Sequence, residues 1–230
     1  GSQDWDLYTF ELYPEAQPNP VTYIKGKVYD IKTKEPLLAT VEIIDLVKDQ
    51  TIYKAPTIMP QGTYIACIPL KSNYAMNVSA QGYLFYSENF TLEKVKKVDK
   101  SYIIDVPLQP IEPGSVVVLK NIFYETDKFQ LKKESEIELK KLINLLQKNP
   151  GLCIEISGHT DNVGGLEHNK SLSTNRAKTV YEYLIQHGIK AERLKYAGYA
   201  YSKPLADNNT AEGRALNRRT EFKVLAINKP

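Results

Sequence analysis

The sequence is poor in the residues that build disulfide scaffolds and metal sites, with two cysteines and three histidines among 230 residues. Two cysteines are too few for the disulfide framework of a small secreted domain. No two histidines have the spacing of a metal-binding pair, so we expect neither a metal nor a cofactor. No apolar run approaches the ~18 residues of a membrane-spanning helix. The composition therefore predicts a globular protein with one large or two small domains.

The two cysteines, Cys67 and Cys153, lie far apart, each within an apolar run. A free cysteine behaves as a small hydrophobe, so we expect both thiols to be buried. They do not fix the redox compartment, because an oxidising one also tolerates buried thiols.

Arginine is missing from the first half of the chain. Residues 1–114 hold 11 lysines and 14 acidic residues, a net charge of −3, whereas residues 115–230 hold all five arginines and a net charge of +6. Arginine suits fork-like recognition of carboxylates and phosphates. This asymmetry favours ligand recognition in the second half, although five arginines are few enough to fall there by chance.

The first twenty residues do not form a domain by themselves. Gly1-Ser2 is typical of a cloning remnant, residues 4–13 alternate like a strand, and residues 14–20 contain three prolines. We expect residues 1–20 to hold a tag remnant, the end of a preceding domain and a linker, so the chain is predicted to be a fragment of a longer protein.

Residues 21–108 have an all-β pattern of short strands separated by glycine, proline and asparagine. This pattern predicts a β-sandwich. The region resembles the carboxypeptidase regulatory-like family, which implies a transthyretin-like sandwich that serves as a spacer or interaction module. The resemblance rests on Ile24-x-Gly26-x-Val28-x-Asp30, Thr33-x-x-Pro36-Leu37, Gly62-x-Tyr64 and Val78-Ser79-Ala80-x-Gly82-Tyr83.

Residues 109–114 form a predicted linker, and residues 115–230 alternate strands with helices. This alternation predicts an α/β domain of βαβαβ type, with a mixed sheet and helices. Strands are expected over 115–124, 152–157, 194–199 and 220–226, and helices over 132–149 and 171–187, with a short helix capped by Thr210.

The loop after the second of these strands, residues 157–165, carries the most chemistry. In open α/β sheets ligands gather at the carboxyl ends of the strands. Arg176 lies fifteen residues after Asp161, on a helical stripe with Asn169 and Ser173. A carboxylate and a guanidinium on one cleft suit a zwitterionic ligand, but spacing alone fits a plain salt bridge better. His159 is expected to be a structural side chain.

The second half resembles the OmpA C-terminal, peptidoglycan-binding domain, from about Val116 to Ala226. Five separated blocks in the same order carry the resemblance: Ile154-x-Ile156-x-Gly158-His159-Thr160-Asp161, Asn169-x-x-Leu172-Ser173-x-x-Arg176-Ala177, Gly198-Tyr199, Asn217-Arg218-Arg219-x-Glu221-Phe222 and, with substitutions, Ile122–Lys128.

The resemblance implies non-catalytic binding of a peptidoglycan peptide stem. It implies that Asp161 and Arg176 hold the diaminopimelate of the stem. It also implies that the same groove is lined by Asn169, Thr126, Asp127 and Arg218. Arg218 has a competing role as a brace for the final strand. The alternatives are a cell-wall hydrolase using His159, Asp161 and a metal, and a scaffold whose β-sandwich binds partner proteins while the α/β domain is inert.

The domain order resembles one architecture of Bacteroidetes envelope proteins that includes type IX secretion lipoproteins. It implies a periplasmic location, association with the outer membrane through parts outside this sequence, and envelope or secretion-system proteins as partners. We expect no nucleic-acid partner, because the net charge of +3 is small.

Overall fold

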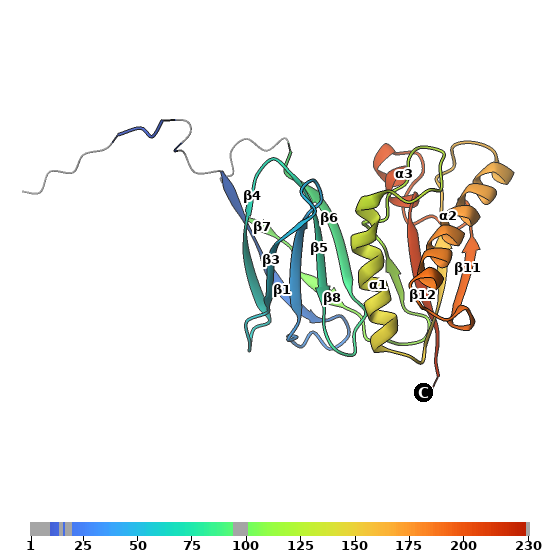
Figure 1. Cartoon of the computed structure of the whole chain (residues 1–230), viewed down its shortest axis with the longest axis horizontal. Coiled ribbons are helices and arrows are strands. Elements are labelled where there is room, and N and C mark those ends of the chain that lie inside the picture. The colour runs from blue at the N-terminus through green and yellow to red at the C-terminus, as the bar shows by residue number, and fades with distance from the viewer. Residues whose placement is uncertain (1–9, 14–15, 17–19, 94–100, 229–230) are drawn as a thin grey trace, which may run out of the picture.

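The computed structural model describes residues 10–13, 16, 20–93 and 101–228, in which two β-sheets precede an α/β unit (Figure 1). Most of the strand predicted over residues 4–13 lies outside the described residues. Residues 10–13 carry no strand, so the prediction is wrong there. A strand needs a partner to satisfy its backbone hydrogen bonds, and this segment precedes the first paired strand.

The N-terminal unit, from residue 20 to residue 111, consists of two sheets around one apolar cluster. Most predicted strands are confirmed, but Gln50–Pro56 was missed because its side chains are largely exposed and give little apolar signal. The first sheet has the order β3 (Gln50–Pro56), β2 (Thr40–Asp45), β5 (Asn73–Ser79), β6 (Tyr86–Thr91). The second contains β4 (Thr63–Pro69), β1 (Val21–Asp30), β7 (Tyr102–Ile103) and β8 (Val106–Leu108).

The strand predicted over residues 101–108 is broken into β7 and β8. Both pair in parallel with β1, but the carboxylate of Asp105 accepts the backbone N–H of Lys27 at 3.0 Å between them. The Asp105 side chain thus takes the place of one backbone hydrogen bond between the strands.

The prediction that both cysteines are buried is wrong. Cys67 is exposed and Cys153 is partly exposed. Successive side chains in a strand point to opposite faces, and the neighbours Ala66 and Ile154 take the buried positions. The apolar runs were therefore read correctly as strands, but the thiols lie on their outer faces.

The C-terminal unit, residues 115–228, has a sheet of order β11-β10-β12-β9. Its elements are β9 (Val116–Val118), α1 (Glu136–Lys148), β10 (Leu152–Gly158), α2 (Leu166–Gln186), β11 (Leu194–Gly198), α3 (Ala211–Asn217) and β12 (Thr220–Ile227). Strand β10 is parallel to β11 and antiparallel to β12, which confirms a mixed sheet.

Several boundaries in this unit differ from the prediction, two of them by five residues or more. The strand expected over 115–124 ends at Val118, because the chain turns at Lys120–Asn121 and buries the Asn121 side chain. Helix α2 begins at Leu166, five residues before the predicted start. The predicted cap of α3 is confirmed, since Thr210 Oγ1 accepts the N–H of Gly213 at 2.9 Å.

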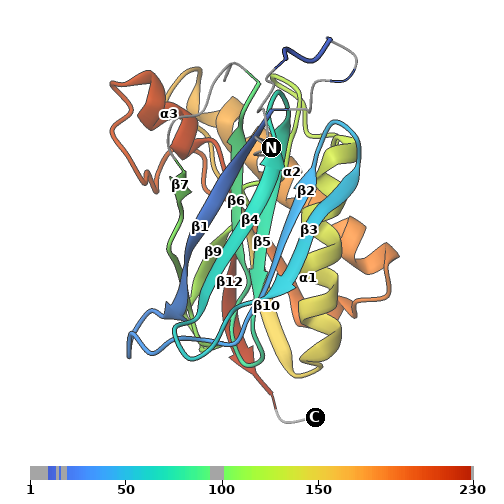
Figure 2. The same cartoon turned by 90° about the vertical axis from the view of Figure 1, so that its left-hand side faces the viewer.

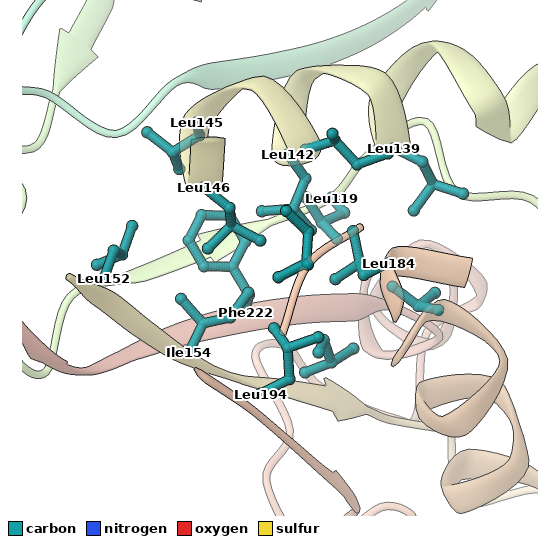
Figure 3. Packing of buried hydrophobic residues seen from close by; sticks show 14 of the residues in the cluster. Leu119, Leu139, Leu142, Leu145, Leu146, Leu152, Ile154, Leu184, Leu194 and Phe222 are labelled. Carbon is teal, nitrogen blue, oxygen red and sulfur yellow. The ribbon is translucent and has the colours of Figure 1, made fainter. Parts of the chain in front are cut away.

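Helix α1 packs its leucines against β10 and β12. Leu139, Leu142 and Leu146 are fully buried, with Phe222 of β12 at the centre of the cluster (Figure 3). The i, i+3, i+7 spacing of the three leucines places them on one helix face. This packing fixes the sheet whose strand ends carry the candidate site.

The N-terminal unit contributes directly to this core. Leu84 and Phe85, which precede β6, belong to the same buried cluster as α1, β10 and β12, and the rings of Phe85 and Phe222 lie 6.0 Å apart. Figure 2 looks onto the N-terminal sheets, with α1 and the C-terminal unit behind them. The two units therefore share apolar packing.

Polar contacts reinforce this junction. Asn121 is fully buried, and its Nδ2 donates to Ser87 Oγ at 2.9 Å and to Glu138 Oε2 at 3.0 Å. Glu42 of β2 pairs with Lys141 of α1, and Lys120 lies 2.6 Å from Glu88. Burial raises the pKa of Glu138 to about 7, although contacts with Ser87 and Asn121 lower it in part.

Candidate functional site

The candidate site lies where the parallel strands β10 and β11 end side by side. Gly158 and Gly198 are opposite each other in the register, and the loops beyond them are joined because Thr160 N–H donates to Ala200 O at 2.9 Å. Asp161 follows in the β10 loop. The carboxyl ends of these strands form an edge of the kind where ligands bind in open α/β sheets.

Two glycines allow α2 to approach this edge closely. A Cβ atom at Gly158 would lie 2.1 Å from the Ser173 carbonyl oxygen, and one at Gly198 would lie 2.2 Å from Thr174 Oγ1. Ser173 Oγ also accepts the N–H of Ala200 at 3.1 Å. Glycine at both positions therefore positions α2, and Arg176 with it, beside the β10 loop.

Asp161 is nearly buried and makes two contacts. Its Oδ1 accepts the N–H of Val163 at 3.0 Å, and its Oδ2 accepts from Arg218 Nη1 at 2.6 Å. The Arg218 side chain is 49% exposed, whereas that of Asp161 is 11% exposed. The direct ionic partner of Asp161 is therefore Arg218.

Arg176 lies on α2 and is held by the segment before α1. Its Nε donates to the carbonyl of Lys128 at 3.0 Å, and its guanidinium carbon lies 4.8 Å from the centre of the Tyr124 ring. Burial raises the pKa of Tyr124 to about 12, so the ring beneath the guanidinium stays neutral. Burial also lowers the pKa of Arg176, while the charges of Asp127 and Asp161 counteract this effect. Arginine remains cationic at any physiological pH.

Asp161, Arg176 and Arg218 therefore form one electrostatic group. Asp161 and Arg218 both lie close enough to act on the charge of Arg176, which itself donates to backbone carbonyls. A plain Asp161–Arg176 salt bridge, which spacing alone favoured, is not among the ion pairs of the described residues. The group carries two positive charges and one negative charge.

Asn169 supports the loop from inside. It is 3% exposed, and its Nδ2 donates to the carbonyl of Val163 at 2.9 Å. The stripe predicted for Asn169 and Ser173 is buried against the sheet, while Arg176 is half-buried beside it. In this structure Asn169 holds the shape of the Asp161 loop.

Thr126 and Asp127 lie in an exposed turn before α1. Asp127 has a φ of +58°, a left-handed conformation that aspartate tolerates better than most residues. Its Oδ1 lies 2.7 Å from Nε2 of His168, at the start of α2. The structure thus brings this turn to Arg176, which contacts the carbonyls of Glu125 and Lys128.

His159 is a buried side chain of the same loop. Its ring is 1% exposed and stacks on Tyr199 with centroids 5.5 Å apart. Nε2 lies 3.2 Å from Glu221 Oε1, outside hydrogen-bond geometry. Burial raises the pKa of Glu221, but contacts with His159 and Arg219 outweigh that effect and leave it lowered.

Sequence reasoning missed Tyr124 and His168. Tyr124 was placed inside a longer strand, although its position in the block resembling the OmpA strand end was a usable signal. His168 is exposed and contacts a residue 41 positions away, which no local pattern predicts.

A hollow of about 220 Å³ between the N-terminal unit and β9 contains none of the predicted site residues. Within the described ranges, no group of three histidine, cysteine or acidic side chains is placed to hold a metal. No helix in that part of the chain is long and apolar enough to cross a membrane.

Residues 123–218 match the OmpA family. The chain is 34% identical over 136 residues to outer membrane porin F of Pseudomonas aeruginosa, covering 59% of this chain and 39% of the porin. It is 36% identical over 146 residues to motility protein B of Bacillus subtilis, covering 58% of this chain and 56% of that protein. A solved structure, the cell wall anchor of the T6SS from Pseudomonas aeruginosa, is 30% identical with a TM-score of 0.42, covering 48% of this chain and 79% of that chain.

Residues 123–218 are thus an OmpA-family domain, which confirms the central part of the resemblance found in the sequence. The chain spans less than half the length of porin F.

Proposed function

We propose that the C-terminal unit binds the peptide stem of peptidoglycan without catalysis and anchors a larger envelope complex to the cell wall. Asp161 accepts hydrogen bonds from the ammonium of diaminopimelate, and Arg176 receives its carboxylate in a fork. The observation that carries this proposal is a nearly buried carboxylate grouped with two guanidiniums at the ends of β10 and β11 in an OmpA-family domain.

The contacts already made by Asp161 and Arg176 leave hydrogen-bonding capacity free for a ligand. An ionised carboxylate has about four acceptor sites, and Asp161 uses two of them here. Arg176 has five N–H donors, of which Nε and Nη2 contact backbone carbonyls. In this proposal Arg218, the ion-pair partner of Asp161, lines the same groove.

The other predicted residues have supporting roles in this proposal. Asn169 holds the Asp161 loop, and the turn that contains Thr126 and Asp127 forms the wall beside Arg176. The low exposure of His159 argues against a hydrolase that uses it as a base or metal ligand.

We further propose a location in the periplasm, associated with the outer membrane. The N-terminal sheets are inferred to be a carboxypeptidase regulatory-like sandwich, and the domain order resembles that of the type IX secretion lipoprotein PorE. A role in type IX secretion, with other envelope proteins as partners, rests on that resemblance of order.

Sedimentation with insoluble peptidoglycan tests the proposal. Asp161→Ala and Arg176→Ala are each expected to abolish sedimentation, because loss of one partner of a charge-assisted contact costs ~2–5 kcal/mol. Lys178→Ala, on an exposed position of the same helix as Arg176, is the matched control and should sediment like the wild type. Unchanged sedimentation of both site variants would contradict the proposal.

A further inference from the structure

A second ionisable pair lies at the rim of the proposed site. His168 Nε2 is 2.7 Å from Asp127 Oδ1, and the two side chains are 57% and 62% exposed. Asp127 belongs to the turn whose carbonyls, at Glu125 and Lys128, accept from Arg176. Helix α2 therefore holds this turn at two points, once through Arg176 and once through His168.

Only one of these two attachments depends on pH. Arginine stays charged, whereas histidine is the side chain whose charge ordinarily changes between pH 5 and pH 8. A protonated His168 forms an ion pair with Asp127, whereas a neutral His168 can still donate an N–H to the carboxylate but carries no opposite charge. The strength of the second attachment therefore follows the protonation of His168.

The charge of Asp127 reaches the ligand-binding guanidinium, since it acts on Arg176. When His168 is neutral, the uncompensated carboxylate of Asp127 repels a carboxylate that approaches Arg176. When His168 is protonated, that charge is balanced and the turn is tied to α2. Both effects favour anion binding at lower pH.

The remaining charged groups around the turn do not titrate in this range by their residue type. They include the Glu125–Lys128 ion pair within the turn, Lys132 after it, Arg176 on α2, and the Asp161–Arg218 pair from the β10 loop and the end of α3. His159 is the one other histidine near the site, and it lies beneath Tyr199 beside Glu221. A substitution at His168 alone therefore distinguishes the pH effect of His168 from that of His159.

We propose that His168 is a proton-sensitive positioning residue that tightens the site for carboxylates as the pH falls. This inference rests on the proposed function, because it assigns regulation to the same site. The ligand class it concerns is a stem peptide with a free carboxylate on its diamino acid.

Calorimetry with a synthetic L-Ala-γ-D-Glu-meso-diaminopimelate tripeptide at pH 5.5, 6.5 and 7.5 tests the inference. The wild type is expected to bind about two- to five-fold more tightly at pH 5.5 than at pH 7.5, the size of an exposed ion pair. His168→Gln keeps a polar side chain without the charge and should give a flat profile. Asp127→Asn should also be flat and should bind more tightly than the wild type at pH 7.5.

A ligand-free measurement accompanies the calorimetry. The backbone amide resonances of residues 125–128 should shift between pH 5 and pH 8 in the wild type and not in His168→Gln. Equal affinity of the wild type at all three pH values would overturn the inference and leave the proposed function standing. Absence of tripeptide binding at every pH would overturn the proposed function and the regulation with it, even where the amides titrate.

Discussion

Asp161 shows what a sequence can and cannot predict about a single residue. The His159-Thr160-Asp161 block indicated that this carboxylate belongs to the site, and the structure places it at the ends of the parallel strands. Which guanidinium contacts it could not be predicted. Spacing along the chain pointed to Arg176, fifteen residues away, but the partner at 2.6 Å is Arg218, 57 residues away.

Asn169 illustrates a related difficulty. The helical stripe correctly put it on the same side as Ser173, but the stripe does not reveal whether that side faces a ligand or the sheet. Because α2 rests on Gly158 and Gly198, the side faces the sheet, and Asn169 bonds to the loop backbone.

Glu138 should make stability depend on pH near neutrality. Burial raises its pKa to about 7 in the folded protein, from an ordinary value of 4.5. Between about pH 4.5 and pH 7 the folded state therefore binds more protons than the unfolded state, so stability falls as the pH rises through this window, by up to roughly 3 kcal/mol. Glu138→Gln should remove this decline and be more stable than the wild type at pH 8.

Chemical denaturation at pH 5, 6, 7 and 8 measures this effect. Glu136→Gln is the matched control, because Glu136 lies on the same helix with a 44% exposed side chain. If the stability of the wild type and that of Glu138→Gln changed in the same way between pH 5 and pH 7, Glu138 would not be the source of the decline.

At the scale of elements, the site depends on how closely α2 approaches β10 and β11. The sequence predicted both strands and the helix, and the glycines at their ends were visible. The sequence could not reveal how closely α2 approaches the two strands, because that distance depends on how the elements pack together and not on the pattern of either element. The early end of β9 was hidden for a similar reason, since Asn121 turns the chain to reach Glu138 and Ser87.

Gly158→Ala should displace α2 and weaken ligand binding without touching a charged group. The added methyl would meet the Ser173 backbone carbonyl at 2.1 Å, which cannot rotate away. Overpacking of this kind costs ~1–3 kcal/mol of stability. Gly165→Ala, where a Cβ has open space, is the matched control. Thermal unfolding and tripeptide calorimetry together measure the effect, and equal stability and affinity of both variants would contradict this account of α2.

At the scale of the whole molecule, the two units share a core. Their strand and helix patterns were predicted separately, and the segment between them was predicted to be a linker. No pattern in the sequence indicated that Leu84 and Phe85 pack with Phe222 and α1, since tertiary contacts between distant segments leave no periodic signal. The boundaries at residues 108 and 115 remain predictions, but a C-terminal unit cut there loses part of its core.

Phe85→Ala should therefore destabilise the C-terminal unit, although Phe85 belongs to the N-terminal one. Phenylalanine-to-alanine changes in a core cost ~3–5 kcal/mol. We expect hydrogen exchange to accelerate in α1 and β12 of this variant. Phe90→Ala, which removes a ring that packs on Tyr74 within the N-terminal sheets, should leave α1 and β12 better protected. Equal protection of these elements in both variants would show that the shared packing is energetically unimportant.

The most direct test of the central claim asks what Asp161 and Arg176 recognise. Calorimetry compares stem tripeptides that end in diaminopimelate or in lysine, which lacks only the side-chain carboxylate. The wild type should prefer diaminopimelate by ~1–3 kcal/mol, because lysine offers no carboxylate to the free N–H groups of the half-buried Arg176 guanidinium. Arg176→Ala should bind weakly and discriminate little between the two. A wild type that binds both tripeptides equally would contradict the zwitterion mechanism, even if alanine at either position abolished binding.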